Sequence, residues 1–239
     1  MGKYIHYFKN ESDFTNKYYG EEYLEPWVSL TDTENEHVDY NKRMATVDLG
    51  LPSGNLWAPY NLGASSSAET GDYYAWAELE PKGYFSRSTY KYFDEENYMY
   101  TKYNDSQHTR LLLEDDAANV KLGGGWQIPT QEDFQELLVE CEFTSINDDD
   151  LGTTYTKVTS RINGNSIAIL NGGFYTDSYL NSDEFFFLWL ANDTWGECSS
   201  PYYELINVGK GSSTEQGYFI DTYPRYYGCQ IRPVLKLGS

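Results

Sequence analysis

At 239 residues, with a formal net charge of -20 at pH 7, the chain is long enough to bury a full core and is strongly acidic. This charge argues against DNA or RNA as a partner, because phosphate binding needs clustered Lys and Arg, and it disfavours anionic membrane surfaces. No segment approaches the roughly 20 apolar residues that a membrane span needs, so we expect no membrane insertion.

Aromatic residues make up 17% of the chain and include 24 tyrosines. Tyrosine gives a large amphipathic contact area at low entropic cost, so a Tyr-rich, acidic, loop-rich chain favours a recognition surface. The alternative is that these rings fill the core of a β-rich fold.

Residues 1–45 differ in pattern from the rest of the chain and are predicted to form a small N-terminal module. A short strand is expected over 4–8, followed by a helix that Ser12 caps and Gly20 closes. We expect this module to serve attachment or oligomerisation, the alternative being an extra β-layer on the main domain. The first residues contain no apolar run followed by a small-residue cleavage site, so no secretory signal is predicted.

The main domain begins near Ala45, with strands expected on both sides of a turn at 52–54. A Ser-rich loop occupies 63–71, and residues 73–77 are expected to be buried. Residues 80–113 show little periodicity but many aromatic side chains. We therefore expect this long loop region to pack through its own side chains.

The clearest element is a helix that begins at about Gln131. Thr130 occupies its N-cap position, and Asp133 supplies the acidic half of a capping box. Apolar residues recur at i, i+3, i+4 and i+7, which predicts one buried face made of Phe134, Leu137, Leu138 and Cys141. A shorter helix is expected over 115–120, stopped by Gly123.

A β-hairpin is predicted after this helix. Its arms are residues 155–160 and 166–170, and the Asn163-Gly164 pair between them is typical of a hairpin turn.

The final third reads as short antiparallel strands, over 186–190, 202–208, 217–222 and 228–235. Apolar residues on both faces of 202–208 predict that this strand is covered on both sides. Arg232 is interpreted as a structural residue that closes the last strand against the strand of Val47. A disulfide between Cys198 and Cys229 is an open alternative, but it is disfavoured because nothing else in the sequence indicates an oxidising compartment.

Five blocks of sequence, in order over residues 46–235, resemble the Fibrobacter major paralogous domain family, which is common in gut Bacteroidetes and their phages. The blocks are residues 47–58, 71–78, 114–118, 123–138 and 225–234. The resemblance implies an α+β, C-type-lectin-like domain over 46–239, with short antiparallel strands, two helices and long irregular loops. It also implies use as a binding scaffold, in some members as the variable protein of a diversity-generating retroelement.

Metal binding and catalysis find no support in the motifs. The acidic run 147–152 fails as an EF-hand loop, because Leu151 falls at the fifth-position ligand and Val158 at the twelfth. Residues 80–82 read Glu-Pro-Lys, which argues against the calcium-dependent sugar site of animal C-type lectins. No CxxC, HExxH or nucleophile elbow is present. We expect no metal, no cofactor and no enzymatic activity, while a glycosidase pair of carboxylates is an open alternative.

The family resemblance directs attention to the last third of the chain, where exposed aromatic rings alternate with short polar groups. Such a surface suits stacking on sugars or contact with proteins, and about half of its tyrosines are expected to be core residues. The predicted ligand-binding residues are Asn192, Asp193, Trp195, Tyr202, Tyr203, Tyr218, Asp221, Tyr223, Tyr226 and Tyr227.

Together these features predict a non-enzymatic ligand-binding protein, a phage virion fibre or adhesin component that recognises a bacterial surface glycan or protein. Residues 1–45 are expected to contact other virion proteins or a second copy of the chain. Two alternatives are a virion structural or decoration protein that contacts only other subunits, and an adhesin of the bacterial cell surface.

Overall fold

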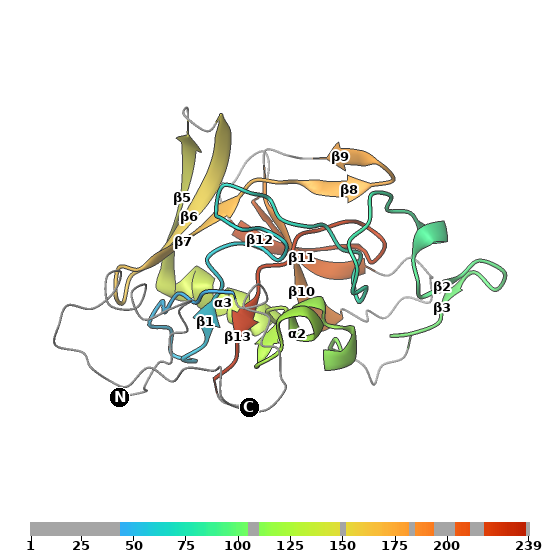
Figure 1. Cartoon of the computed structure of the whole chain (residues 1–239), viewed down its shortest axis with the longest axis horizontal. Helices are drawn as coiled ribbons and strands as arrows, with labels where there is room; N and C mark the ends of the chain where they lie inside the picture. Colours follow the sequence, from blue (N-terminus) through green and yellow to red (C-terminus); the bar gives the residue numbers. More distant parts are fainter. Residues whose placement is uncertain are drawn as a thin grey trace, which may run out of the picture. The chain divides into compact units, whose positions relative to one another are not determined.

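The computed structural model describes residues 44–104, 110–148, 152–181, 185–193, 204–210 and 218–237. The chain divides into two compact units, Met1–Arg43 and Met44–Ser239, and every described residue lies in the second. The expected module over 1–45 falls, except for its last two residues, outside the described residues, so its role stays a prediction. Short antiparallel strands and two α-helices make up the described part, in agreement with the expected α+β class (Figure 1).

One small sheet joins the beginning and the end of this unit. Its strands are β1 (Leu56–Trp57), β13 (Val234–Leu235) and β4 (Trp126–Gln127), in the order β1-β13-β4. Val47 bridges to Trp57, so the expected pairing of the last strand with the Val47 strand is wrong. The turn at 52–54 folds Val47 back onto one edge of β1, and β13 pairs with the other edge.

Arg232 is a structural residue, as expected. Its side chain is 1% exposed, and it donates hydrogen bonds to Asn61 Oδ1 at 2.8 Å and to the carbonyl oxygens of Ala58 at 3.1 Å and Ala168 at 2.8 Å. Burial lowers the pKa of its guanidinium to about 9, so the group stays charged at neutral pH.

The predicted central helix is α3 (Gln131–Glu140), and its capping box is confirmed. The Thr130 hydroxyl accepts from the Asp133 backbone N–H at 3.2 Å, and the Asp133 carboxylate accepts from the Thr130 N–H at 2.7 Å. Cys141 is buried, but its backbone is already extended, because the chain passes directly from α3 into a strand. Its assignment to the helix face is therefore wrong, although its place in the core is confirmed.

The second predicted helix is α2 (Ala117–Leu122), which follows the 3-10 turn η4 (Leu113–Asp115). It begins two residues later than expected, because Asp116 acts as its N-cap and accepts from the Asn119 N–H at 3.0 Å. Gly123 ends the helix with a φ of 64°, as its position predicts.

The predicted hairpin is confirmed as β6 (Thr153–Ser160) and β7 (Ser166–Leu170), and β5 (Cys141–Asp148) adds a third strand on the other side of β6. A separate two-stranded hairpin consists of β8 (Phe174–Thr176) and β9 (Tyr179–Asn181). Figure 1 shows this hairpin and the long β5–β6–β7 sheet in the upper part of the view, with the helices below.

A third sheet contains three of the four strands expected in the final third of the chain. They are β10 (Phe187–Asp193), β11 (Glu204–Lys210) and β12 (Tyr218–Pro224), in that order. The fourth, expected over 228–235, is a strand only at β13, and residues 228–230 form isolated bridges. Two-sided burial was expected for 202–208, whose side chains lie outside the described residues, so it stays a prediction. Two-sided burial is found at β10, where each residue from Phe186 to Ala191 is at most 5% exposed.

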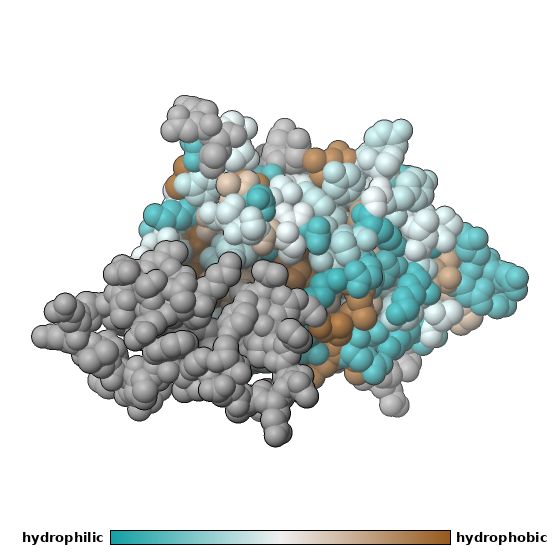
Figure 2. Space-filling model, viewed as in Figure 1, coloured by the Kyte–Doolittle hydropathy of each residue, from teal (hydrophilic) through white to brown (hydrophobic). Residues whose placement is uncertain are grey.

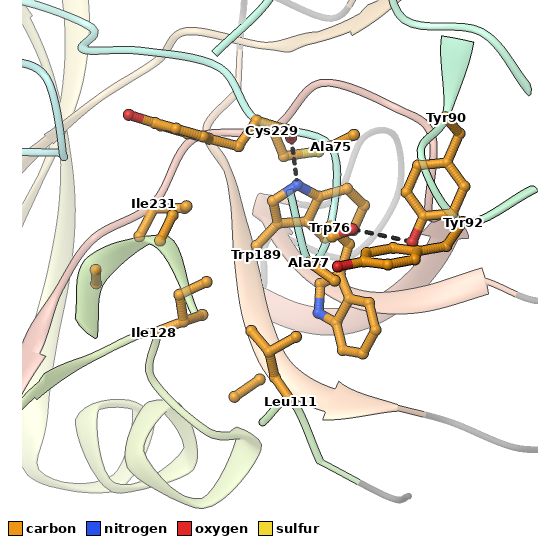
Figure 3. Packing of buried hydrophobic residues seen from close by; sticks show 14 of the residues in the cluster. Ala75, Trp76, Ala77, Tyr90, Tyr92, Leu111, Ile128, Trp189, Cys229 and Ile231 are labelled. Atoms are coloured by element: carbon orange, nitrogen blue, oxygen red, sulfur yellow. Dashed lines mark hydrogen bonds between the residues drawn. The ribbon is translucent and has the colours of Figure 1, made fainter. Parts of the chain in front are cut away.

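β10 separates two hydrophobic cores, because successive side chains of a strand point to opposite faces. We call the first the aromatic core; β10 gives it Phe187, Trp189 and Ala191, and it includes Tyr74, Trp76, Phe85, Tyr90, Tyr92, Tyr100 and Tyr103 (Figure 3). We call the second the aliphatic core; β10 gives it Leu188 and Leu190, with Phe186 just before the strand, and it includes Leu49, Leu137, Val158, Ile167, Ile169 and Val234.

The long loop region packs through its own aromatic side chains, as expected. It contains the 3-10 turn η3 (Arg87–Thr89) and a hairpin of β2 (Phe93–Asp94) and β3 (Met99–Tyr100). The rings of Tyr90, Tyr92, Tyr100 and Tyr103 are each at most 8% exposed. Figure 2 shows a mostly hydrophilic surface at the tip of the hairpin. Among the described residues, no helix is long and apolar enough to cross a membrane.

Candidate functional site

The structure brings three of the predicted ligand-binding residues together. Tyr226 and Tyr227 are in edge contact with ring centroids 5.3 Å apart, and Tyr223 lies 6.4 Å from Tyr227. All three rings are partly buried against the aromatic core, where Tyr227 stacks on Phe174 at 5.4 Å. They form its outer layer, so their exposed portions are available to a ligand while their inner portions hold the core.

The structure says less about the other predicted residues. The Asn192 side chain accepts a hydrogen bond from the Gln131 N–H at 2.6 Å, which fastens β10 to the start of α3. Asp193, Tyr218 and Asp221 occupy positions in β10 and β12. Trp195, Tyr202 and Tyr203 lie outside the described residues. Ligand binding by this set of ten stays a prediction.

A different surface contains two adjoining hollows that share Tyr73 as a wall. We call the first the sheet-end hollow; its volume is about 620 Å³, and its lining includes Tyr73, Asn147, Asp148, Thr153, Thr154 and Asn171. We call the second the loop hollow; its volume is about 590 Å³, and its lining includes Asp72, Tyr73, Lys82, Phe85, Tyr175 and Ser178. Both volumes fall within the range of about 300–1,000 Å³ that is typical of small-molecule sites.

The sheet-end hollow lies where the inner face of the β5–β6–β7 sheet changes from apolar to polar. Near the base of the sheet, Val158 lies opposite Phe143 and belongs to the aliphatic core. Thr154, four residues before Val158 in β6, lies opposite Asn147, and its hydroxyl donates to Asn147 Oδ1 at 2.9 Å. Asn171 continues this polar row, because its N–H donates to the Thr154 carbonyl at 3.1 Å.

Tyr73 is held in a fixed orientation between the two hollows. Its hydroxyl donates to the Gly172 carbonyl at 2.5 Å and accepts from Gln230 Nε2 at 3.3 Å, while its ring makes an edge contact with Tyr175 at 4.7 Å. Burial, together with the nearby Tyr175, raises the pKa of Tyr73 to about 12, so the phenol is neutral at ordinary pH. Because the hydroxyl is used within the protein, Tyr73 offers a ligand its ring.

Gly172 is required for this arrangement. A Cβ at this position would lie 2.2 Å from Gln230 Nε2 and 2.9 Å from the Tyr73 hydroxyl, which is closer than real Cβ contacts. The glycine therefore lets the Gln230 amide and the Tyr73 hydroxyl approach the backbone under the sheet-end hollow.

The loop hollow contains charged groups that are already paired within the protein. Lys82 Nζ lies 2.7 Å from a Glu78 carboxylate oxygen and donates to the Thr89 carbonyl at 2.9 Å. The Asp72 carboxylate accepts from the Tyr74 hydroxyl at 3.2 Å. The lining is thus polar without a free positive charge directed at a ligand.

Several uncharged groups in the hollows retain hydrogen-bonding capacity. Within the described ranges, the Asn147 amide nitrogen and the hydroxyls of Thr153 and Ser178 have no protein partner. Thr156, two residues inward from Thr154 on the same face of β6, is fully buried and its hydroxyl is also unpaired in that part of the chain. Asn147 and Ser178 are exposed and Thr153 is half-buried, so these three groups are open to water or a ligand, whereas the buried Thr156 hydroxyl carries the cost of an unpaired polar group.

The described residues contain no group of three or more His, Cys, Asp or Glu side chains that could hold a metal ion. The hollows offer one fixed aromatic ring with amides, hydroxyls and two carboxylates around it.

Sequence reasoning did not identify the hollows. Asn147 was considered only as part of an acidic run, and Thr154 and Asn171 lie just outside the two predicted hairpin arms. One signal was present, since Val158, Thr156 and Thr154 alternate along β6 and become polar towards its open end. That gradient predicts that this part of the face does not belong to the core.

Comparison with known proteins adds no further constraint, since no family model, curated protein or solved structure matches this chain at a significant level.

Proposed function

We propose that the protein is a non-enzymatic carbohydrate-binding protein. The observation that carries this proposal is the pair of hollows lined by Tyr73, where a fixed aromatic ring lies among amides, hydroxyls and two carboxylates. A sugar ring presents C–H groups on its faces and hydroxyls at its edge. An aromatic side chain packs against the C–H groups, and amides and hydroxyls pair with the sugar hydroxyls.

The proposed fold family is the C-type-lectin-like Fibrobacter major paralogous type, and the proposed location is a phage virion, on a fibre or adhesin that recognises bacterial surface glycans. Support for the scaffold comes from the five sequence blocks, whose residues Trp57, Trp76 and Arg232 are each at most 1% exposed. Blocks that supply the core would suit a scaffold in which the surface is free to vary. Detection of the protein in purified particles would test the location.

The function is tested by binding of the full-length, fluorescently labelled protein to whole Bacteroidetes cells and to their extracted surface polysaccharides. Tyr73→Ala removes the shared wall and is expected to weaken binding about 5- to 150-fold, since an aromatic ring in a binding site contributes about 1–3 kcal/mol. Tyr226→Ala addresses the surface predicted from the sequence in the same assay.

Thr144→Ala is the matched control, because Thr144 is exposed on β5 and lines neither hollow. Binding measured in the presence of a calcium chelator shows separately whether the interaction depends on calcium. Equal binding by the parent and by Tyr73→Ala, with the variant folded, would remove the hollows from the proposal. Loss with Tyr226→Ala alone would move the site to the outer layer of the aromatic core.

A further inference from the structure

We propose that the two hollows bind one neutral oligosaccharide of two or more rings, which crosses Tyr73 and places sugar rings on both sides of it. This inference rests on the proposed function and adds to it the charge and the minimum length of the ligand.

The geometry points to an extended ligand because the two hollows have one lining residue in common. Thr153 lines the sheet-end hollow, Ser178 lines the loop hollow, and Tyr73 lines both. A single sugar ring on one side of Tyr73 leaves the polar groups on the other side to water. A longer chain of sugars reaches both sets and packs against the shared ring.

The wall that such a ligand crosses is preorganised. The Tyr73 hydroxyl is bonded to the Gly172 carbonyl and the Gln230 amide, and its ring rests against Tyr175. Immobilising a flexible side chain on binding costs conformational entropy, and this cost is small when the side chain is already fixed.

The charge distribution selects against acidic sugars. The sheet-end hollow contains the Asp148 carboxylate and the loop hollow the Asp72 carboxylate, while the one cationic side chain of the two linings, Lys82, is paired with Glu78. The chain as a whole carries a formal charge of -20. A ligand bearing carboxylates or phosphates would be repelled by this field and would find no free cation to pair with.

The probes are oligosaccharides prepared by partial hydrolysis of Bacteroidetes surface polysaccharides. Ion exchange separates them into a neutral and an acidic pool, and gel filtration divides each pool by length from one to six sugars. Affinity for the full-length protein is measured with each fraction. We expect binding to the neutral pool, with affinity at least 10-fold higher for chains of two or more sugars than for single sugars.

Two variants test whether both hollows contact the same ligand. Thr153→Ala and Ser178→Ala each remove one hydroxyl from one hollow, and each is expected to weaken binding of the longer neutral fractions about 2- to 10-fold. Thr144→Ala should leave binding unchanged. On single sugars, at most one of the two variants should have an effect, because a single ring occupies one hollow.

The outcomes separate this inference from the proposed function. Binding of polysaccharides that neither Thr153→Ala nor Ser178→Ala weakens would keep the function and overturn the assignment to both hollows. Equal affinity for acidic and neutral pools, or for single sugars and longer chains, would overturn the inference in the same way. Absence of binding to every fraction and to whole cells, with a known lectin as positive control, would overturn both.

Discussion

The two cores on either side of β10 are built by different rules. The aliphatic core joins regular elements, α3 and the β5–β6–β7 sheet, whose backbone groups pair among themselves. The aromatic core joins irregular loops, and its rings carry polar groups that pair with the backbone. Trp189 Nε1 donates to the Tyr74 carbonyl at 2.6 Å and Trp76 Nε1 to the Leu190 carbonyl at 2.9 Å, so the loop and the strand are bonded in both directions.

The tyrosines extend this arrangement. The Tyr90 hydroxyl donates to the Trp76 carbonyl at 3.0 Å, as Figure 3 shows, and those of Tyr92 and Tyr103 donate to the two oxygens of the Asp115 carboxylate at 2.7 and 2.5 Å. A loop without a partner strand leaves backbone groups unpaired, and buried phenols and indoles can satisfy them. A Tyr-rich core therefore suits a chain segment with little regular structure.

The largest expected effect lies at adjacent positions of β10 that face different cores. Trp189→Ala should lower the free energy of unfolding by about 3–5 kcal/mol, since it opens a large cavity and removes one of the two hydrogen bonds to the Tyr74 carbonyl, which the Cys229 N–H still donates to. Leu188→Ala should cost about 2–5 kcal/mol through the cavity alone. Denaturant unfolding measures both.

Trp189→Phe sharpens this comparison, because it keeps most of the volume and removes the indole N–H. If Trp189→Phe were as stable as the parent protein, the bond from the indole to the Tyr74 carbonyl would contribute nothing, and the two cores would differ in shape only.

The next effect is a pH dependence of the free energy of unfolding, to which the neighbouring carboxylates Asp115 and Asp116 contribute in opposite directions. Burial raises the pKa of Asp116 from its ordinary 3.8 to about 6. The folded state then holds a proton that the unfolded state releases, so the contribution of Asp116 is full below 3.8 and is lost as pH rises through about 6, by about 3 kcal/mol. Asp116→Asn should remove this slope, which urea unfolding between about pH 3 and 8 measures.

Asp115 is expected to act in the opposite direction. Burial alone would raise its pKa, but hydrogen bonds from Lys102, Tyr103 and Tyr92 outweigh burial and lower the pKa below its ordinary value. Its stabilising contribution is present above that ordinary value and is lost as the pH falls. If Asp115→Asn and Asp116→Asn changed the pH profile in the same direction, the assigned environments would be incorrect.

The smallest effect concerns one hydroxyl of the aromatic core. Tyr103→Phe removes the hydrogen bond to the Asp115 carboxylate and should cost about 1.5–3 kcal/mol, the usual range for a bond to a charged group. Ile169→Val, a small truncation in the aliphatic core, should cost about 0.5–1.5 kcal/mol. Thermal unfolding of both variants under one condition checks which of them is less stable. Tyr103→Phe should be the less stable one, and Ile169→Val would be the less stable one if a water molecule took over the hydrogen bond of the lost hydroxyl.

Local chemistry made part of the fold predictable. Thr130 with Asp133 specified the start of α3, and Asn163-Gly164 specified the β6–β7 hairpin, because each signal acts within a few residues. The partner of β13 and the two-sided burial of β10 depend on contacts between distant segments. The first was therefore predicted wrongly, and the second was not predicted at all.

The hollows could not be predicted from the sequence either, because they too depend on contacts between distant segments. Asn147, Thr154 and Asn171 come from separate segments and meet only when the register is set, and Tyr73 and Gln230 are far apart in the chain. By contrast, the grouping of Tyr223, Tyr226 and Tyr227 could be expected, because they are close in sequence.

The alternation along β10 also restricts how the protein can change. A slip of this strand by one residue would exchange the indole of Trp189 with the isobutyl group of Leu190, and so place the wrong shape in both cores at once. Every slip by an odd number of residues is penalised in both cores. Substitutions in the surface loops leave this penalty unchanged, so the register of β10 does not depend on them.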